Sequence, residues 1–148
     1  MLAFEAKNPD YKKLILEKLK GQHFMKHIGM AITDIEPGYV TAEVELKQIH
    51  NQQDGITHGG VTATIADIAM GFAAFSLVEK GKGMVTSKLE VSYLNPSIDG
   101  KLIAKGKVIK AGNRLYYCEA DIINERLNNT STLVAKSTGI MCTINLQQ

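Results

Sequence analysis

The feature that most constrains the fold is a long segment with almost no polar side chains, residues 61–78. Its polar residues are Thr62, Thr64, Asp67 and Ser76. A helix in this segment is apolar on nearly every face, which predicts burial inside a domain. A membrane span is disfavoured, because the segment is rich in Ala, Thr and Gly and a central Asp would oppose insertion by roughly 2.5 to 3.5 kcal/mol. We therefore predict a buried helix over residues 60–80 and no membrane contact.

Strand-like patterns surround this helix. Residues 30–36 and 39–46 precede it, joined at Pro37-Gly38, and the second run alternates apolar and polar side chains with the period of two that a strand shows. Four further runs follow it, at residues 85–94, 102–110, 115–124 and 132–146. With no helix between these last four, a parallel sheet of βαβ units is disfavoured. The predicted fold class is α+β: an antiparallel sheet of five to six strands wrapped round one long buried helix, the hot-dog fold.

The N-terminal region predicts a peripheral helix at about residues 8–20. Asn8 is suited to cap it, Pro9 fits its first turn, and Gly21 is suited to end it. This helix covers either the sheet or a pocket. The length of 148 residues predicts one domain, residues 1–148.

Composition excludes some classes of function. The 17 basic and 15 acidic residues leave a formal charge of +2, which gives no support to a nucleic-acid or membrane surface. Cys118 and Cys142 lack the spacing of a metal or redox motif and read as free thiols in a reducing compartment. We predict no metal site. The N-terminus lacks the pattern of a secretory signal, so a cytoplasmic location is expected.

Two features of the buried helix suggest chemistry. The first is its entry, His58-Gly59-Gly60, where unpaired N–H groups and the helix dipole suit a carbonyl oxygen that becomes an oxyanion. The two glycines remove the side chains that would block its approach. The alternative is a tight turn with an ordinary loop histidine.

The second feature is Asp67. A carboxylate that is buried without a partner is costly, and such a group is suited to act as a general base. The alternative is an aspartate bonded to nearby backbone or to a Ser or Thr. Gly59 lies eight residues before Asp67, which is roughly 12 Å along a helix and too far for both to touch one carbonyl. If they cooperate, two helices must lie antiparallel across a dimer axis, giving two sites per homodimer.

Residues 52–60, with the sequence QQDGITHGG, and residues 67–71, DIAMG, resemble the signature of hot-dog acyl-CoA thioesterases of the PaaI-like, phenylacetate-pathway type. The resemblance covers roughly residues 39–146. It implies that the Gly59 N–H polarises the thioester carbonyl while His58 shapes the loop. It also implies that Asp67 activates water or attacks the carbonyl directly.

The resemblance implies further site residues. Gln52 matches the family's Asn or Gln that holds the water or the carboxylate, and Asn51 is its neighbour. Thr86 or Ser87 matches a hydroxyl on the strand after the helix, with Thr86 preferred. The substrate-binding candidates are Gly60, Asn51, Thr86, Ser87, Met70 and Arg114. Some relatives have Glu in place of Asp67 and a Ser or Thr in place of Gly71, which leaves the arrangement of water and carboxylate open.

The implied substrate is an acyl- or aryl-CoA, with no metal or organic cofactor. Met70, Phe72 and Phe75 are candidates to line its acyl pocket, although their spacing also suits a core. Arg114 is the candidate phosphate contact, because a guanidinium matches phosphate oxygens. Basic residues near it also suit a solvated strand face; they are Lys82, Lys88, Lys105, Lys107 and Lys110.

Two other functions remain as alternatives. A hot-dog hydratase or dehydratase would pair His58 with an acid, and its usual loop surroundings are missing here. A non-catalytic acyl-CoA binding or sensing protein would have no need of Asp67. The resemblance also leaves dimer and tetramer open, since hot-dog dimers often pair again through their sheets.

Overall fold

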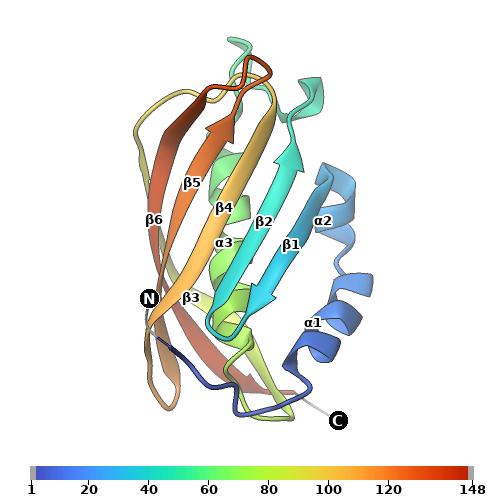
Figure 1. Cartoon of the computed structure of the whole chain (residues 1–148), viewed down its shortest axis with the longest axis vertical. Helices are drawn as coiled ribbons and strands as arrows, with labels where there is room; N and C mark the ends of the chain where they lie inside the picture. The colour runs from blue at the N-terminus through green and yellow to red at the C-terminus, as the bar shows by residue number, and fades with distance from the viewer. Residues whose placement is uncertain (1–2, 147–148) are drawn as a thin grey trace.

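Two short helices open the part of the chain that the computed structural model describes, residues 3–146 (Figure 1). They are α1 (Tyr11–Lys20) and α2 (His23–Ile28). α1 begins later than predicted, because the Asn8 side chain accepts the Asp10 N–H at 3.0 Å in a turn that precedes the helix. Pro9 therefore lies in that turn and not in the first turn of α1.

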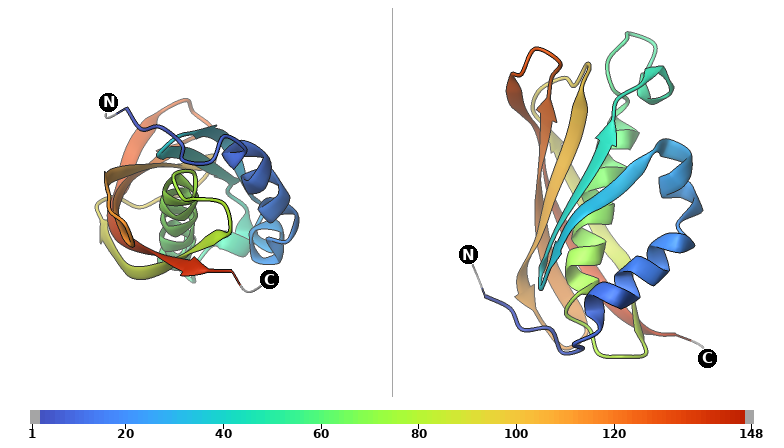
Figure 2. Two further views of the ribbon diagram at one scale, coloured as in Figure 1. Left: turned by 90° about the horizontal axis from the view of Figure 1, so that it is seen from below. Right: turned by 45° about the vertical axis from the view of Figure 1, so that its right-hand side comes forward.

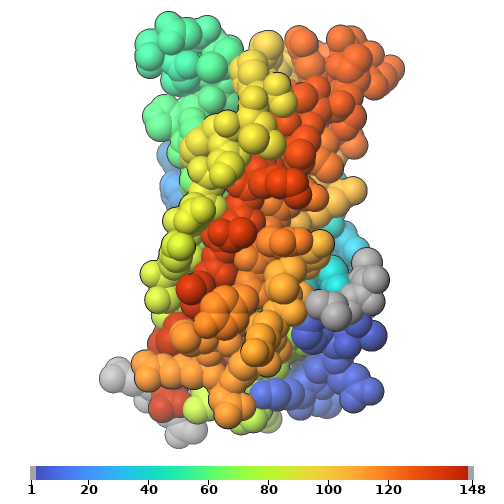
Figure 3. Space-filling model, turned by 90° about the vertical axis from the view of Figure 1, so that its left-hand side faces the viewer, coloured from blue at the N-terminus to red at the C-terminus, as the bar shows by residue number. Residues whose placement is uncertain are grey.

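Six strands form one antiparallel sheet, and this number is the upper end of the predicted range of five to six. They are β1 (Met30–Glu36), β2 (Tyr39–Glu45), β3 (Lys82–Tyr93), β4 (Lys101–Ala111), β5 (Leu115–Glu125) and β6 (Ser131–Asn145). Their order across the sheet is β1-β2-β4-β5-β6-β3, so β3 is an edge strand although it is third along the chain. Figure 3 shows β3 along the margin of the sheet, beside β6. The loop between β2 and the central helix contains one short helix, η1 (Gln48–His50).

The central helix is α3 (Gly59–Phe75), and the sheet curls round it, with α1 and α2 beside it (Figure 2). This is the hot-dog fold that the element order predicts. α3 ends about five residues before the predicted boundary. The Ser76 side chain accepts the Gly38 N–H at 2.7 Å and donates to the Ala73 carbonyl at 2.6 Å, which ties the end of the helix to the β1–β2 turn.

Small residues bring α3 close to the sheet. A Cβ atom placed on Gly106 of β4 would lie 2.4 Å from the Ala69 backbone carbon and 2.7 Å from the Met70 nitrogen. Ala66, Ala69 and Ala73 have no exposed surface. The backbones of β4 and α3 therefore approach each other closely where β4 crosses the middle of the helix.

The prediction that α3 is buried all round is wrong for one face. Ala63, Thr64, Asp67, Ile68 and Gly71 are half-buried, and their spacing places them along one side of the helix. The sheet covers the opposite side, and nothing in residues 3–146 closes this one completely. None of the helices in those residues has the length and hydropathy that crossing a bilayer requires.

Candidate active site

The start of α3 is built by the residue before it. The His58 Nδ1 atom accepts the Gly60 N–H at 2.8 Å, and the His58 carbonyl accepts the Val61 N–H at 2.9 Å. His58 is therefore the cap of α3, and its ring carries a proton on Nε2 when it accepts at Nδ1. This capping bond occupies Gly60, the second N–H of the helix.

The first N–H of α3, on Gly59, is left free. No acceptor in residues 3–146 bonds it. Tyr93 at the end of β3 fixes this residue from the other side, because its hydroxyl donates to the Gly59 carbonyl at 2.9 Å. A Cβ on Gly59 would lie 3.3 Å from the Tyr93 ring. Gly59 thus presents one unpaired donor at the positive end of a helix, the geometry that an oxyanion requires.

The loop before Gly59 is anchored by His50, a residue that sequence reasoning missed. His50 is 2% exposed, its Nδ1 accepts the Lys47 N–H at 2.9 Å, and its Nε2 donates to the Ile28 carbonyl at 2.7 Å. Its own carbonyl accepts the His58 N–H at 2.8 Å. His50 therefore bonds the end of α2 through its buried ring and the cap of α3 through its backbone carbonyl. Nothing in the sequence distinguished His50 from the other histidines.

Gln52 and Asn51 shape the same loop. The Gln52 N–H donates to the Ile56 carbonyl at 2.9 Å, and its side-chain Oε1 accepts the Asp54 N–H at 3.0 Å. Asn51 pairs with Thr57 in an isolated β-bridge. Gln52 lines a cavity with His58 and Gly59, whereas Asn51 does not.

That cavity, which we call the loop cavity, has a volume of about 580 Å³. Gln52, His58, Gly59, Tyr93 and Ser97 are among the residues that line it. Its walls come from the loop before α3 and from the segment that leaves β3, so it lies at the start of the helix.

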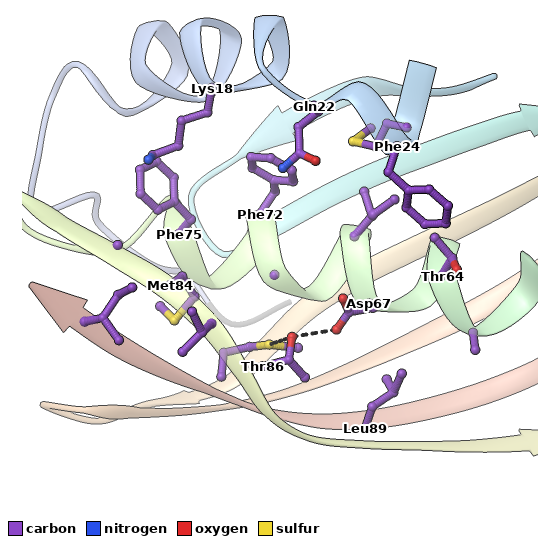
Figure 4. A pocket seen from close by; sticks show the side chains of 18 of the residues that line it. Lys18, Gln22, Phe24, Thr64, Asp67, Phe72, Phe75, Met84, Thr86 and Leu89 are labelled. Atoms are coloured by element: carbon purple, nitrogen blue, oxygen red, sulfur yellow. Dashed lines mark hydrogen bonds between the residues drawn. The ribbon is translucent and has the colours of Figure 1, made fainter. Parts of the chain in front are cut away.

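Asp67 lies elsewhere, on the open face of α3. Its Oδ1 accepts a hydrogen bond from the Thr86 hydroxyl of β3 at 2.6 Å (Figure 4). Asp67 is half-buried. The prediction of a buried carboxylate without a partner is therefore wrong on both points, because the open helix face reaches solvent and β3 supplies a donor. No donor in residues 3–146 bonds the second carboxylate oxygen, which leaves it free to accept a proton.

A β-bulge decides which hydroxyl of β3 meets Asp67. The pairing of β3 with β6 shifts between Thr86 and Lys88, and Ser87 is the extra residue. The bulge reverses the alternation, so that Met84 before it and Val91 after it both pack against the core. Thr86 consequently points to α3 and Ser87 does not line the cavity beside Asp67. Regular alternation along the strand had placed Ser87 on the face of Val91.

The cavity beside Asp67, which we call the helix groove, has a volume of about 480 Å³. Phe72 and Phe75 line it, as predicted for an acyl pocket, together with Ile68, Met84 and Leu89. α1 and α2 form one of its walls, so the N-terminal helices cover a pocket (Figure 4).

Met70 and Arg114 are not brought into either cavity. Met70 has no exposed surface and belongs to the core, where its methyl group would lie 3.1 Å from a Cβ on Gly139. Arg114 is exposed in the hairpin between β4 and β5, at the end of the molecule where α3 finishes (Figure 1). Two of the other basic candidates pair with acids: Lys88 with Glu90 at 3.1 Å and Lys107 with Glu119 at 2.7 Å.

Other chemistries find little support in the described residues. Burial raises the pKa of Cys118 to about 12, so this thiol is protonated at neutral pH and is no nucleophile. Cys118 and Cys142 are both free. No group of three or more His, Cys, Asp or Glu side chains within residues 3–146 could hold a metal ion. His58 has no carboxylate partner among these residues, in contrast to the His–acid pair that a dehydratase would use.

The profile of the Thioesterase superfamily matches residues 54–130, just over half of the chain. This range includes the cap of α3, Asp67 and Thr86. Acyl-coenzyme A thioesterase 13 of Homo sapiens is 26% identical over 127 residues, which cover 84% of this chain and 88% of that protein.

Solved structures agree on the fold. A thioesterase family protein from Silicibacter pomeroyi has a TM-score of 0.89 and 26% identity, over 92% of this chain and 99% of that one. The E. coli PaaI protein from the phenylacetic acid degradation operon has a TM-score of 0.81 at 20% identity, covering 95% and 97% of the two chains.

Proposed function

Because the chain belongs to the thioesterase superfamily and is a thioester hydrolase, we propose that it hydrolyses acyl- or aryl-CoA. Asp67 would serve as general base or nucleophile, and the Gly59 N–H as oxyanion donor. The observation that carries this proposal is the free N–H at the start of α3 on the same helix as a carboxylate with one free oxygen. The human relative, named an acyl-coenzyme A thioesterase, supports CoA as the thiol.

Each polar contact has a place in the reaction. The thioester carbonyl oxygen would accept the Gly59 N–H, which is strengthened by the α3 dipole. Thr86 holds one Asp67 oxygen, and the other would take a proton from the attacking water. The C–O bond forms, the C–S bond breaks, and the thiol leaves with a proton, giving a free acid and CoA. Direct attack by Asp67, followed by hydrolysis of the anhydride, ends in the same products.

Gln52 would assist from the loop cavity. Its Oε1 is occupied by the Asp54 N–H, and no acceptor in residues 3–146 bonds its amide N–H groups. These donors are suited to hold the water or the carboxylate.

A complete site would need two copies of the chain. Gly59 and Asp67 line different cavities, and eight residues of helix separate them by roughly 12 Å. In an antiparallel pair of α3 helices with the two-fold axis near Ala63, the partner subunit's Gly59 would face Asp67. The edge strand β3 supports pairing here, because Val85 is 45% and Tyr93 56% exposed on a strand with one unpaired side.

A tetramer of two such dimers stays a prediction. So does a cytoplasmic location, which the two free thiols support.

The first test is thiol release from short, medium, long and aryl acyl-CoAs, with the unmodified protein and with Asp67→Asn. We expect the variant to lose about 100-fold or more in kcat while its melting temperature stays close to that of the unmodified protein. Full activity of Asp67→Asn would refute the role of this carboxylate.

The Gly59 donor can be removed by Gly59→Pro. Proline is favoured at the first helical position, and His58 has φ −62° and ψ 134°, a conformation that a residue before proline adopts readily. Gly59→Ala is the matched control, because it adds a Cβ against Tyr93 and keeps the N–H. We expect Gly59→Pro to lose about 100-fold in kcat and Gly59→Ala to lose far less.

Mixing the two defects tests the shared site. A dimer of one Gly59→Pro chain and one Asp67→Asn chain would have one site with both changes and one with neither. Random pairing should restore about a quarter of the unmodified activity. No recovery in mixed dimers, verified by affinity tags on the two chains, would place both groups in one chain's site.

A further inference from the structure

The helix groove contains two opposite charges that lie apart from one another. Two charged residues line it within the described chain, Asp67 near its middle and Lys18 of α1 at the far end (Figure 4). Between them the walls are apolar, with Ile68, Phe72 and Phe75 from α3. An acyl chain that lies along these walls would reach the Lys18 ammonium at the far end of the groove.

Lys18 lies over an aromatic ring and forms no ion pair with an acid in residues 3–146. Its Nζ lies 5.0 Å from the centre of the Phe75 ring, and no carboxylate in residues 3–146 lies within ion-pair distance. Two acids line a neighbouring cavity with Lys18 and are paired elsewhere, Glu17 with Lys20 at 2.8 Å and Glu79 with Lys7 at 3.9 Å. The Phe75 face stabilises the ammonium without supplying a hydrogen-bond acceptor.

Gln22 adds a second set of donors, between Lys18 and Asp67 along the groove. Its side chain lines the groove and lies near Phe72 in Figure 4, and no partner in residues 3–146 bonds its amide. An ammonium at the end of an apolar groove and an amide along its wall, neither paired within residues 3–146, suit a ligand with a negatively charged atom.

We infer that Lys18, assisted by Gln22, selects acyl groups that carry an anion at the end remote from the thioester. This inference rests on the proposed function, because it concerns the acyl group of the same site. An ω-carboxyacyl thioester has the required form: its carbonyl meets Asp67, its methylene chain lies along Ile68 and Phe72, and its distal carboxylate meets Lys18.

The length of the chain follows from α3. Phe75 lies eight residues after Asp67, roughly 12 Å along the helix. Roughly 3 Å at each end goes to the contacts with Asp67 and with Lys18, which leaves about 6 Å for the chain. An extended chain advances about 1.2 Å per bond, so about five bonds fit. A six-carbon diacid matches this span.

Lys18 also separates two cavities. It lines the helix groove and a second cavity of about 460 Å³ between α1 and the end of α3, and Phe75 is shared by both. The Lys18–Phe75 pair therefore closes the groove at its far end. An apolar chain longer than the groove would have to displace it.

The test compares two thioesters of equal length, adipoyl-CoA and hexanoyl-CoA, in the unmodified protein, Lys18→Met and Lys18→Arg. We expect kcat/KM to favour adipoyl-CoA by about tenfold or more, the effect of one charge-assisted hydrogen bond near solvent. Lys18→Met should lower this ratio about tenfold, and Lys18→Arg should keep most of it. Lys13→Met is the matched control, since Lys13 is exposed on the same helix and lines neither cavity.

Equal ratios in the unmodified protein and Lys18→Met would overturn the inference, as would a preference for hexanoyl-CoA in the unmodified protein. If neither thioester is hydrolysed, the proposed function fails, and both compounds remain intact as ligands. Their melting shifts then decide the inference: a larger shift with adipoyl-CoA that Lys18→Met abolishes supports it, and equal shifts reject it.

Discussion

The two sides of α3 differ in how closely they are packed against other parts of the protein. On the side towards the sheet, Ala66, Ala69 and Ala73 have no exposed surface, and Gly106 of β4 touches the helix backbone. On the other side, a Cβ added to Gly71 would meet nothing within 4 Å, and Asp67 faces a groove. Small residues therefore bring the backbone close to the sheet on one side of the helix and leave space for a ligand on the other. Substitutions on the two sides should consequently act on different quantities, stability on the first and turnover on the second.

The largest effect is expected at Gly106. In Gly106→Ala the new Cβ would meet the Ala69 carbon at 2.4 Å and its oxygen at 2.6 Å, and backbone atoms in a packed helix cannot move aside cheaply. We expect a loss of roughly 3 kcal/mol or more in the free energy of unfolding. Urea denaturation followed by circular dichroism measures it. A stability within 1 kcal/mol of the unmodified protein would show that the sheet side of α3 is less tightly packed than described.

On the open side, Thr86→Val should reduce turnover and leave the fold intact. It removes the 2.6 Å hydrogen bond that orients Asp67, and hydrogen bonds to charged groups contribute roughly 1.5 to 3 kcal/mol, which corresponds to a fall of about tenfold or more in kcat. Thr86→Ser keeps the hydroxyl and is the control. Steady-state thiol release measures both variants, and equal rates for Val and Ser would remove Thr86 from the site.

His58→Ala tests the start of α3, where the two sides meet. Loss of the Nδ1 acceptor for the Gly60 N–H should lower the free energy of unfolding by about 1 kcal/mol. His58→Asn should restore the cap, because Asn is a preferred capping residue. If His58 acts through the loop alone, Asn also restores thiol release. Restored stability without restored turnover would instead give the imidazole a chemical role.

The smallest effect is expected for Gly71→Ala. A glycine inside a helix is less favourable than alanine by about 0.5 to 1 kcal/mol, and open space surrounds Gly71. We expect this variant to be more stable by about that amount, opposite in sign to Gly106→Ala. Thermal unfolding under matched conditions compares the pair. A destabilised Gly71→Ala would mean that another part of the assembly fills this position.

Local rules predicted most of the fold correctly where periodicity was strong. All strands except β3 begin and end within one residue of their predicted limits, because turn residues mark their ends, whereas β3 begins three residues before its predicted limit. The helix boundaries were wrong where a side chain bonds to the backbone outside the helix. Ser76 ends α3 early through Gly38 of a distant turn, and Asn8 delays α1 through a turn of its own. The pattern of apolar residues contains no trace of such bonds.

The candidate site also contains residues that the sequence identified and residues that it did not. Gly59, His58 and Asp67 were identified from the sequence, because a glycine pair and a single carboxylate are conspicuous in an apolar segment. His50 and Tyr93, which hold the loop and Gly59 in place, were missed, since a buried imidazole and an aromatic ring on a strand look ordinary in sequence. Met70, a candidate for the acyl pocket, instead faces the core, as its spacing on the helix also allowed.

The sequence by itself determined that one apolar helix must be enclosed by antiparallel strands, and that this helix carries a carboxylate eight residues after a glycine. Both are properties of neighbouring residues along the chain, which set burial and helical spacing. Only the tertiary structure decided that Thr86 and not Ser87 meets Asp67, and that Lys18 stands at the far end of the groove. The first depends on a β-bulge and the second on how α1 packs beside α3, and contacts between distant segments determine both.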